Sequence, residues 1–257
     1  MNIDREKLSP MMKKYLETKD EYPDCILFYR LGDFYEMFFD DALLASRILD
    51  IALTGKACGL EERAPMCGVP YHSASSYLTR LVEAGYKVAI GEQMEDPATA
   101  KGLVKREVVK IVTPGTLLED DSLEKTYNNY LMAIYCQGQD ASIAYVDIST
   151  GELNTSLISL DGVKNEVAKI LPREILSNSP DLLGSLASLS DMANIYLNED
   201  FDISLLDKTV IYDRFEPAYL DKLGLDKDNL ILYSLAIILN YISKTQMMNE
   251  TNLNTIN

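Results

Sequence analysis

A short polar break in the middle of the chain constrains the fold more than any other feature. Residues 117–126 are acidic and polar, while the stretches on both sides alternate short apolar runs with helical apolar patterns. Exposed polar segments mark domain boundaries, and strand-like runs that alternate with helical ones are typical of α/β domains. The sequence therefore predicts two α/β domains, 1–116 and 128–243, joined by a linker at 117–127 and followed by a polar tail at 244–257.

The first of these domains carries local signals for a small mixed sheet. Ser9 followed by Pro10 predicts a helix start, because serine favours the N-cap and proline the first helical position. Further helices are predicted at 40–49 and 73–84. Runs rich in strand-forming residues predict strands at 25–29, 34–39, 65–67, 86–90 and 107–112, within an otherwise loop-rich stretch from 55 to 68.

The second domain begins with a predicted three-strand meander. Its strands are expected at 130–136, 142–148 and 153–158, with glycine-containing turns between them. Strands and helices then alternate, which is again typical of an α/β domain: helices at 163–171, 181–189 and 229–243, and strands at 174–176 and 194–197.

Charge is distributed unevenly between the two halves. Residues 1–116 hold 15 Lys and Arg against 18 Asp and Glu, whereas residues 117–257 hold 9 against 22. Such asymmetry indicates two units with different partners. The most basic window contains a single acid, Glu107, and can be either a solvated strand edge or an edge that grips phosphates; its basic residues are Lys101, Lys105, Arg106 and Lys110.

Cysteine and histidine usage argues against several site classes. The four cysteines are irregularly spaced and His72 is the only histidine, so a structural zinc is not expected. A Ser-His-Asp or Cys-His site would need His72. Its place in a loop entering a helix favours a turn role or a contact to a nucleic-acid backbone. The apolar run at 230–242 is too short to span a bilayer, and a charged N-terminus without a signal-peptide pattern favours a cytoplasmic protein.

Phe34, Glu36 and Phe38 form the most informative local pattern. On a strand all three would share one face, and an acid between two aromatic residues is unusual for a core. Such a pattern suits a base edge, where a ring wedges into the stack and a carboxylate accepts a hydrogen bond from a base. The alternative is a sheet edge with one solvated glutamate.

Five blocks of the first domain closely resemble bacterial MutS mismatch-repair proteins, in the same order. They are SPMM at 9–12, FYRLGDFYEMF at 28–38, PMCGVPYH at 65–72, GEQ at 91–93 followed by DP at 96–97, and VTPGT at 112–116. Residues 128–243 resemble the connector domain of that family, which has an RNase H-like fold. The resemblance thus implies a mismatch-recognition domain followed by a connector domain.

This resemblance also implies roles for individual residues. Phe34 matches the aromatic wedge that stacks on a mispaired or unpaired base, and Glu36 matches the acid that hydrogen-bonds it. Met66 falls in a loop beside the wedge. Lys56 and Arg106 match positions where family members place basic groups near the DNA backbone, and we add His72 and Lys105 to that backbone-binding set. The segment at 54–57 has one basic residue where many members have two.

Partners and cofactors follow from the same resemblance. It implies binding to mismatched or looped double-stranded DNA, contact of the connector domain with a MutL-type partner, and a homodimer of the complete protein. No Gly-x-x-x-x-Gly-Lys-Ser/Thr segment is present. We therefore expect no catalytic residue, metal or cofactor in this chain, with ATP and Mg²⁺ bound by a further ATPase domain of the family.

Two other interpretations of the second domain remain open. RNase H-like nucleases hold metal on carboxylates from several strands, and Asp147, Glu152 and Asp191 could form such a set, although Asp147 also suits a strand end or turn. Alternatively, the acidic second half is a protein-docking module without nuclease activity.

Overall fold

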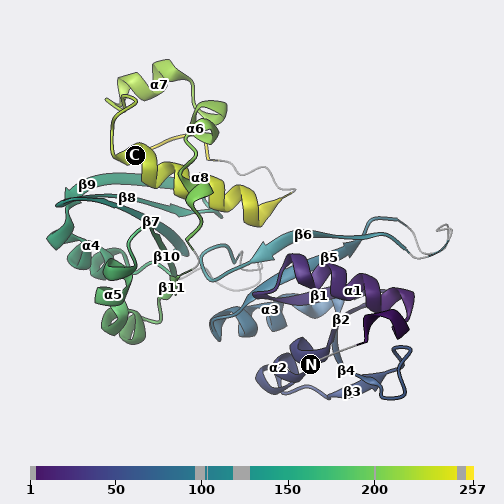
Figure 1. Ribbon diagram of the computed structural model, residues 1–257. Coiled ribbons are helices and arrows are strands. Elements are labelled where there is room, and N and C mark those ends of the chain that lie inside the picture. Colours follow the sequence, from purple (N-terminus) through teal and green to yellow (C-terminus); the bar gives the residue numbers. More distant parts are fainter. Residues whose placement is uncertain (1–3, 96–101, 103, 118–127, 200, 248–252) are drawn as a thin grey trace. The chain divides into compact units, whose positions relative to one another are not determined.

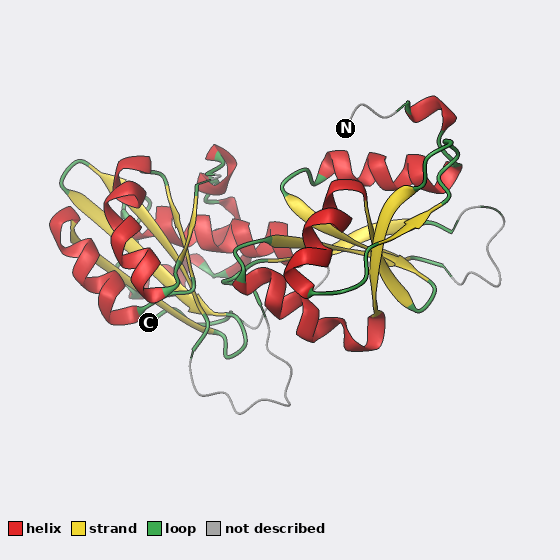
Figure 2. Ribbon diagram, turned by 90° about the horizontal axis from the view of Figure 1, so that it is seen from below, coloured by secondary structure: helices red, strands yellow, loops and turns green. Residues whose placement is uncertain are grey.

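The computed structural model describes residues 4–95, 102, 104–117, 128–199, 201–247 and 253–257 (Figure 1). The chain forms two compact units, Met1–Thr113 and Pro114–Asn257. In each unit a β-sheet lies between helices (Figure 2). None of the helices in the described residues combines the length and apolar character needed to cross a membrane.

The boundary between the units lies three residues before the predicted one. The Gly115 amide donates to the buried Glu174 carboxylate at 2.8 Å, and the Asn129 amide group donates to the carbonyls of Pro114 and Leu117 at 3.2 and 2.8 Å. These bonds attach 114–117 to the second unit. Most of the predicted linker, 118–127, lies outside the described residues.

The first unit contains a six-stranded mixed sheet in the order β3-β4-β2-β1-β5-β6. The β1 and β5 strands are parallel, and all other neighbouring pairs are antiparallel. The strands are β1 (Cys25–Leu31), β2 (Phe34–Phe38), β3 (Thr54–Lys56), β4 (Ala64–Pro70), β5 (Lys87–Gln93) and β6 (Arg106–Val112), and the helices are α1 (Pro10–Glu21), α2 (Phe39–Leu49) and α3 (Ala74–Glu83), with single turns η1 (Arg5–Lys7) and η2 (Tyr71–Ser73).

Helix α1 covers one face of this sheet, which we call the α1 face. Met12 and Tyr15 of the helix pack there against Tyr29 and Phe38, and the Tyr15 ring meets each of these rings edge to face, at 5.4 and 4.9 Å between centroids. Alternate residues point to the other face, where the Cys67 thiol reaches the Ala42 carbonyl of α2.

A buried carboxylate fastens α1, β1 and α2 together. Asp41 accepts hydrogen bonds from the Leu27 amide at 2.9 Å and from the Tyr15 hydroxyl at 3.3 Å, and pairs with Lys19 at 2.9 Å. Burial raises the pKa of the Tyr15 hydroxyl well above its usual value, so this group remains a neutral donor. The network fixes the end of β2 at Phe38, whose amide donates to the Tyr15 hydroxyl.

The second unit has a five-stranded sheet in the order β11-β10-β7-β8-β9. The predicted meander β7-β8-β9 is antiparallel, and β10 and β11 extend it in parallel, which is an RNase H-like arrangement. Its strands are β7 (Tyr130–Gln137), β8 (Asp140–Asp147), β9 (Glu152–Ser159), β10 (Glu174–Ser177) and β11 (Tyr196–Asn198), and its helices are α4 (Val163–Ile170), α5 (Pro180–Ala193), α6 (Thr209–Arg214), α7 (Pro217–Lys222) and α8 (Ile231–Gln246), with single turns η3 (Leu160–Gly162) and η4 (Ile203–Leu206). The sequence did not predict α6 and α7.

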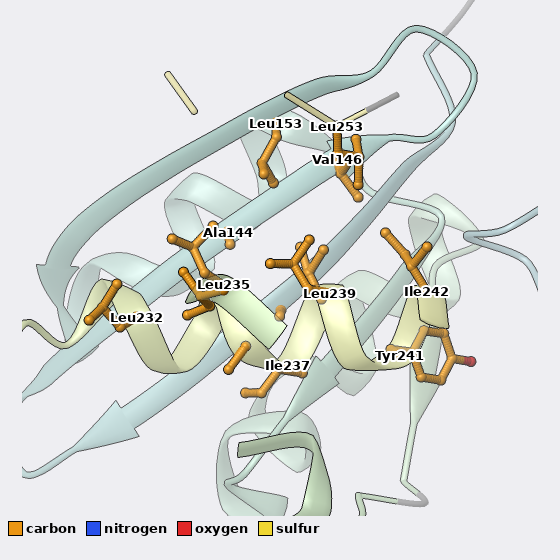
Figure 3. Close-up of a cluster of buried hydrophobic side chains, with 14 of the residues drawn as sticks. Ala144, Val146, Leu153, Leu232, Leu235, Ile237, Leu239, Tyr241, Ile242 and Leu253 are labelled. Carbon is orange, nitrogen blue, oxygen red and sulfur yellow. The ribbon is translucent and has the colours of Figure 1, made fainter. Parts of the chain in front are cut away.

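Helix α8 fills one face of the second sheet, and α4 and α5 cover the other. Figure 3 shows Leu235 and Leu239 of α8 against Ala144 and Val146 of β8. The helix is apolar on most sides because it packs against the sheet and against η4 and α6 as well.

The predicted polar tail at 244–257 is not separate from the second unit. Helix α8 continues to Gln246, and Leu253 and Ile256 are buried in the α8 core. Asn257 exchanges two backbone hydrogen bonds with β9, to Leu153 and Thr155, both at 2.9 Å. Asn257 therefore pairs with backbone groups of the edge strand β9, which composition alone did not reveal.

Candidate nucleic-acid interface

Phe34 opens β2 and projects from the uncovered end of the α1 face. The predicted alternation is confirmed: Phe34, Glu36 and Phe38 pair with Pro70, Gly68 and Met66 of β4 and share one face. Phe38 is 1% exposed under α1, whereas Phe34 is 45% exposed. A phenylalanine ring left this open contributes little to the core and is available for a ligand.

The β1–β2 turn that presents Phe34 is held on several sides. Gly32 adopts φ +61°, a conformation that glycine tolerates best. Its carbonyl accepts from the Arg30 side chain at 2.5 Å and its amide donates to Gln93 at 3.2 Å. The Asp33 carbonyl accepts from the Tyr71 amide at 2.9 Å. These contacts fix the backbone from which the Phe34 side chain projects.

Arg30 and Tyr71 also lie at the Phe34 end of the sheet, and the sequence analysis did not predict them as site residues. The Arg30 guanidinium lies 3.6 Å from the Tyr71 ring centroid, a close cation–π contact. It also forms an ion pair with Glu92 at 3.5 Å. Both residues fall inside the resembling blocks at 28–38 and 65–72, and this was the only signal in the sequence that could have found them.

Glu36 forms an ion pair on the α1 face. Its carboxylate lies 2.5 Å from the Lys56 ammonium, with side-chain exposures of 16% and 34%. The Lys56 ammonium also lies 5.6 Å from the Phe38 ring centroid. The resemblance implied a place for Lys56 near the DNA backbone; in the structure its ammonium has a carboxylate partner, which lies two residues along β2 from Phe34.

Met66 lies on a strand, as the local pattern at 65–67 predicted, and not in the loop that the resemblance implied. It lies within strand β4 opposite Phe38 and Thr54, and it packs partly buried against the α1 core. Phe34 lies opposite Pro70, four residues further along β4. Met66 therefore supports the covered part of the α1 face.

The other predicted backbone-binding residues gather where several strands end. His72 follows the end of β4 and is exposed, with its ring edge to face against Tyr71. Arg106 begins β6, donates to the Arg30 carbonyl at 2.6 Å and lies over the Tyr29 ring at 5.3 Å. Lys105 precedes it. The structure thus places His72, Lys105 and Arg106 at the same end of the sheet as Phe34.

The basic window does not form one continuous stripe. Lys105 pairs with Glu107 at 2.5 Å, and this hydrogen bond raises the pKa of the lysine. Lys110 lies on the opposite face from Arg106 and is partly buried, which lowers its pKa. Lys101 is outside the described residues. Among the described members, Lys105 and Arg106 are the ones at the same sheet end as Phe34.

The three carboxylates considered for a nuclease site do not form a metal-binding group. Asp147 is the last residue of β8 and accepts from the Ser149 amide and hydroxyl at 2.9 and 2.6 Å, which confirms its turn role. Glu152 accepts from Asn154 at 2.9 Å, and Asp191 lies on α5. Within the part of the chain that the structure describes, no group of three acids, cysteines or histidines could hold a metal ion.

Family models identify both units. The model of MutS domain I matches residues 9–121, and the model of MutS domain II matches residues 129–257. The chain belongs to the MutS family.

Relatives named DNA mismatch repair protein MutS match the whole of this chain. The protein of Clostridioides difficile is 57% identical over 257 residues, which are 100% of this chain and 27% of that protein. The proteins of Clostridium beijerinckii and Acetivibrio thermocellus are 48% and 45% identical over 97% of the chain, and the matches span 27% and 29% of them. The chain thus spans a little over a quarter of the length of these relatives.

Proposed function

We propose that the first unit recognises mispaired or unpaired bases in double-stranded DNA within mismatch repair. Phe34 is the wedge that stacks on the base, and Glu36 is the acceptor that bonds to it. The observation that carries this proposal is the half-exposed Phe34 ring on a turn held by Arg30, Gln93 and Tyr71, with a carboxylate two residues along on the same face.

The energy needed to deform the duplex discriminates mismatched from matched DNA. Unstacking a base step costs about a few kcal/mol, and less where pairing is already broken. A ring inserted at a mispair therefore bends the duplex at lower cost than at a matched pair, without reading the neighbouring sequence. Arg106, Lys105 and His72 lie at the same end of the sheet, where they would contact phosphates on either side of the wedge.

Fluorescence anisotropy with a matched duplex and a G·T duplex tests this function directly. We expect the chain to prefer the G·T duplex and Phe34→Ala to lower that preference about tenfold, since base–aromatic stacking contributes roughly 1–3 kcal/mol. The melting temperature should change little, because the ring is half exposed.

Tyr212→Ala is the matched control, since it removes an exposed aromatic ring from the second unit. It should leave both affinities unchanged. An unaltered mismatch-to-match ratio in Phe34→Ala would show that Phe34 is not the wedge.

For the second unit we propose a connector that contacts a MutL-type partner. Its large excess of acids, 22 against 9 basic residues over 117–257, supports a protein rather than a DNA partner. We propose that the complete protein is a cytoplasmic homodimer and that this chain contributes no cofactor site, with ATP and Mg²⁺ bound by a further domain. Titration of this chain with a MutL-type protein tests the partner and should give saturable binding. Titration with Mg-ATP tests the cofactor site and should give no binding.

A further inference from the structure

Lys56 reaches Glu36 across an intervening strand. Lys56 belongs to β3 and Glu36 to β2, and β4 lies between them. Their charged groups nevertheless meet at 2.5 Å on the α1 face. Two side chains must extend toward each other over β4 to make this contact, so the pair is a specific feature of this face.

Gly68 leaves room beside the Glu36 side chain. It is the β4 residue directly opposite Glu36. A Cβ atom at Gly68 would lie 3.5 Å from the Glu36 Cγ and 3.2 Å from the Tyr35 carbonyl oxygen. A larger side chain there would stand beside the glutamate and restrict its orientation, whereas glycine does not.

The pair is more sheltered than most of the ion pairs among the described residues. The Lys56 and Glu36 side chains are 34% and 16% exposed, whereas those of the Lys105–Glu107 pair are 67% and 46% exposed. Charges shielded from water interact more strongly and are screened less by salt. Lys56 therefore holds the carboxylate in one orientation more firmly than a surface lysine would.

We propose that Lys56 is a positioning residue that sets mismatch specificity through Glu36. Its ammonium holds the carboxylate near Phe34 in the orientation that accepts a hydrogen bond from a base. It also offsets the negative charge that approaching phosphates would meet. This inference rests on the proposed function, and it differs from the simpler role of Lys56 as one more phosphate contact.

A double-mutant cycle in DNA binding separates the two roles. Lys56→Met, Glu36→Gln and the double variant are compared by anisotropy with matched and G·T duplexes at low ionic strength, where DNA binding is strongest. We expect Lys56→Met to lower the mismatch-to-match ratio about fivefold, as for directly coupled residues. In the Glu36→Gln background the same substitution should leave the ratio unchanged, and Lys56→Arg should retain it.

Lys105→Met is the matched control, because it also removes a lysine from a Lys–Glu pair. It should weaken binding to both duplexes by one factor. If Lys56→Met also weakened binding to both duplexes equally, with and without Glu36→Gln, Lys56 would be merely a phosphate contact and the inference would be overturned. If the unsubstituted chain and Phe34→Ala bind both duplexes alike, the proposed function itself fails.

A second cycle without DNA tests the pair independently of binding. The unfolding equilibrium constants of the same four proteins are measured in urea at low salt. We expect the double variant to lose less stability than the two single variants together. Purely additive effects would overturn the inference, even if Phe34 proves to be the wedge. Should Lys56→Met prevent folding, Lys56→Gln takes its place in both cycles.

Discussion

Two carboxylates, one in each unit, lie in opposite environments. Glu174 is fully buried, and its donors among the described residues include the Gly115 amide at 2.8 Å, Asn198 at 3.0 Å and the Tyr241 hydroxyl at 2.6 Å. Glu36 is partly exposed and is paired with a single lysine. A carboxylate enclosed by fixed donors stabilises the fold, whereas a partly exposed one held by a single cation can still accept a hydrogen bond from a ligand.

The largest effect is expected at Glu174. Glu174→Ala removes the acceptor shared by three buried donors and should lower the free energy of unfolding of the second unit by about 3 kcal/mol. Urea unfolding measures this. Glu152→Ala, an exposed carboxylate in the same unit, should change stability by less than about 0.5 kcal/mol. Equal effects of Glu174→Ala and Glu152→Ala would show that Glu174 is not a structural carboxylate and would therefore not differ from Glu36 in this way.

Gly115→Ala tests how tightly the Glu174 site is packed. A Cβ atom there would lie 2.8 Å from Leu131 Cδ1 and 2.9 Å from Glu174 Cβ, so we expect a loss of about 2 kcal/mol from overpacking. Gly184 in α5 has nothing within 4 Å of its Cβ position, and Gly184→Ala should stabilise the same unit by about 0.5–1 kcal/mol. Thermal melting of both variants gives the comparison.

Glu36→Ala should affect binding in a direction that a structural acid would not. Removing the carboxylate takes away a charge that repels phosphates and releases Lys56, so affinity for the matched duplex should rise about threefold. The mismatch-to-match ratio should fall. Glu107→Ala is the control, since it releases Lys105 in the same way and should raise both affinities equally. A fall in affinity for both duplexes, with a lower melting temperature, would make Glu36 structural.

The salt dependence of binding to matched DNA should be shallow for a DNA-binding protein. The first half of the chain is slightly acidic, and its basic window is divided between two faces. We expect about three phosphate contacts and hence a slope of about −3 in log K against log salt concentration. Anisotropy at four salt concentrations measures it. A much steeper slope would mean that the charge near Phe34 has been underestimated.

The local pattern of the sequence predicted most strands and helices because each depends on nearby residues. Pro10 begins α1 as predicted, although Ser9 forms no side-chain cap. The meander β7-β8-β9 follows the predicted turns at Gly138 and Gly151, both of which adopt positive φ. The prediction missed β3, α6 and α7 altogether. These elements are short, so their formation depends on contacts with distant segments more than on local propensity.

The candidate site was predicted as residue types on one face, and only the tertiary structure determined their separate roles. Alternation alone put Phe34, Glu36 and Phe38 together, and the order of the resembling blocks indicated the family. The position of α1 decided that Phe38 is core and that Phe34 is open. The sheet order brought Lys56 to Glu36, 20 residues away. Hydrophobic periodicity and secondary-structure propensity depend on neighbouring residues in the sequence. The exposure of a side chain and its pairing partner depend on which distant segments pack against it.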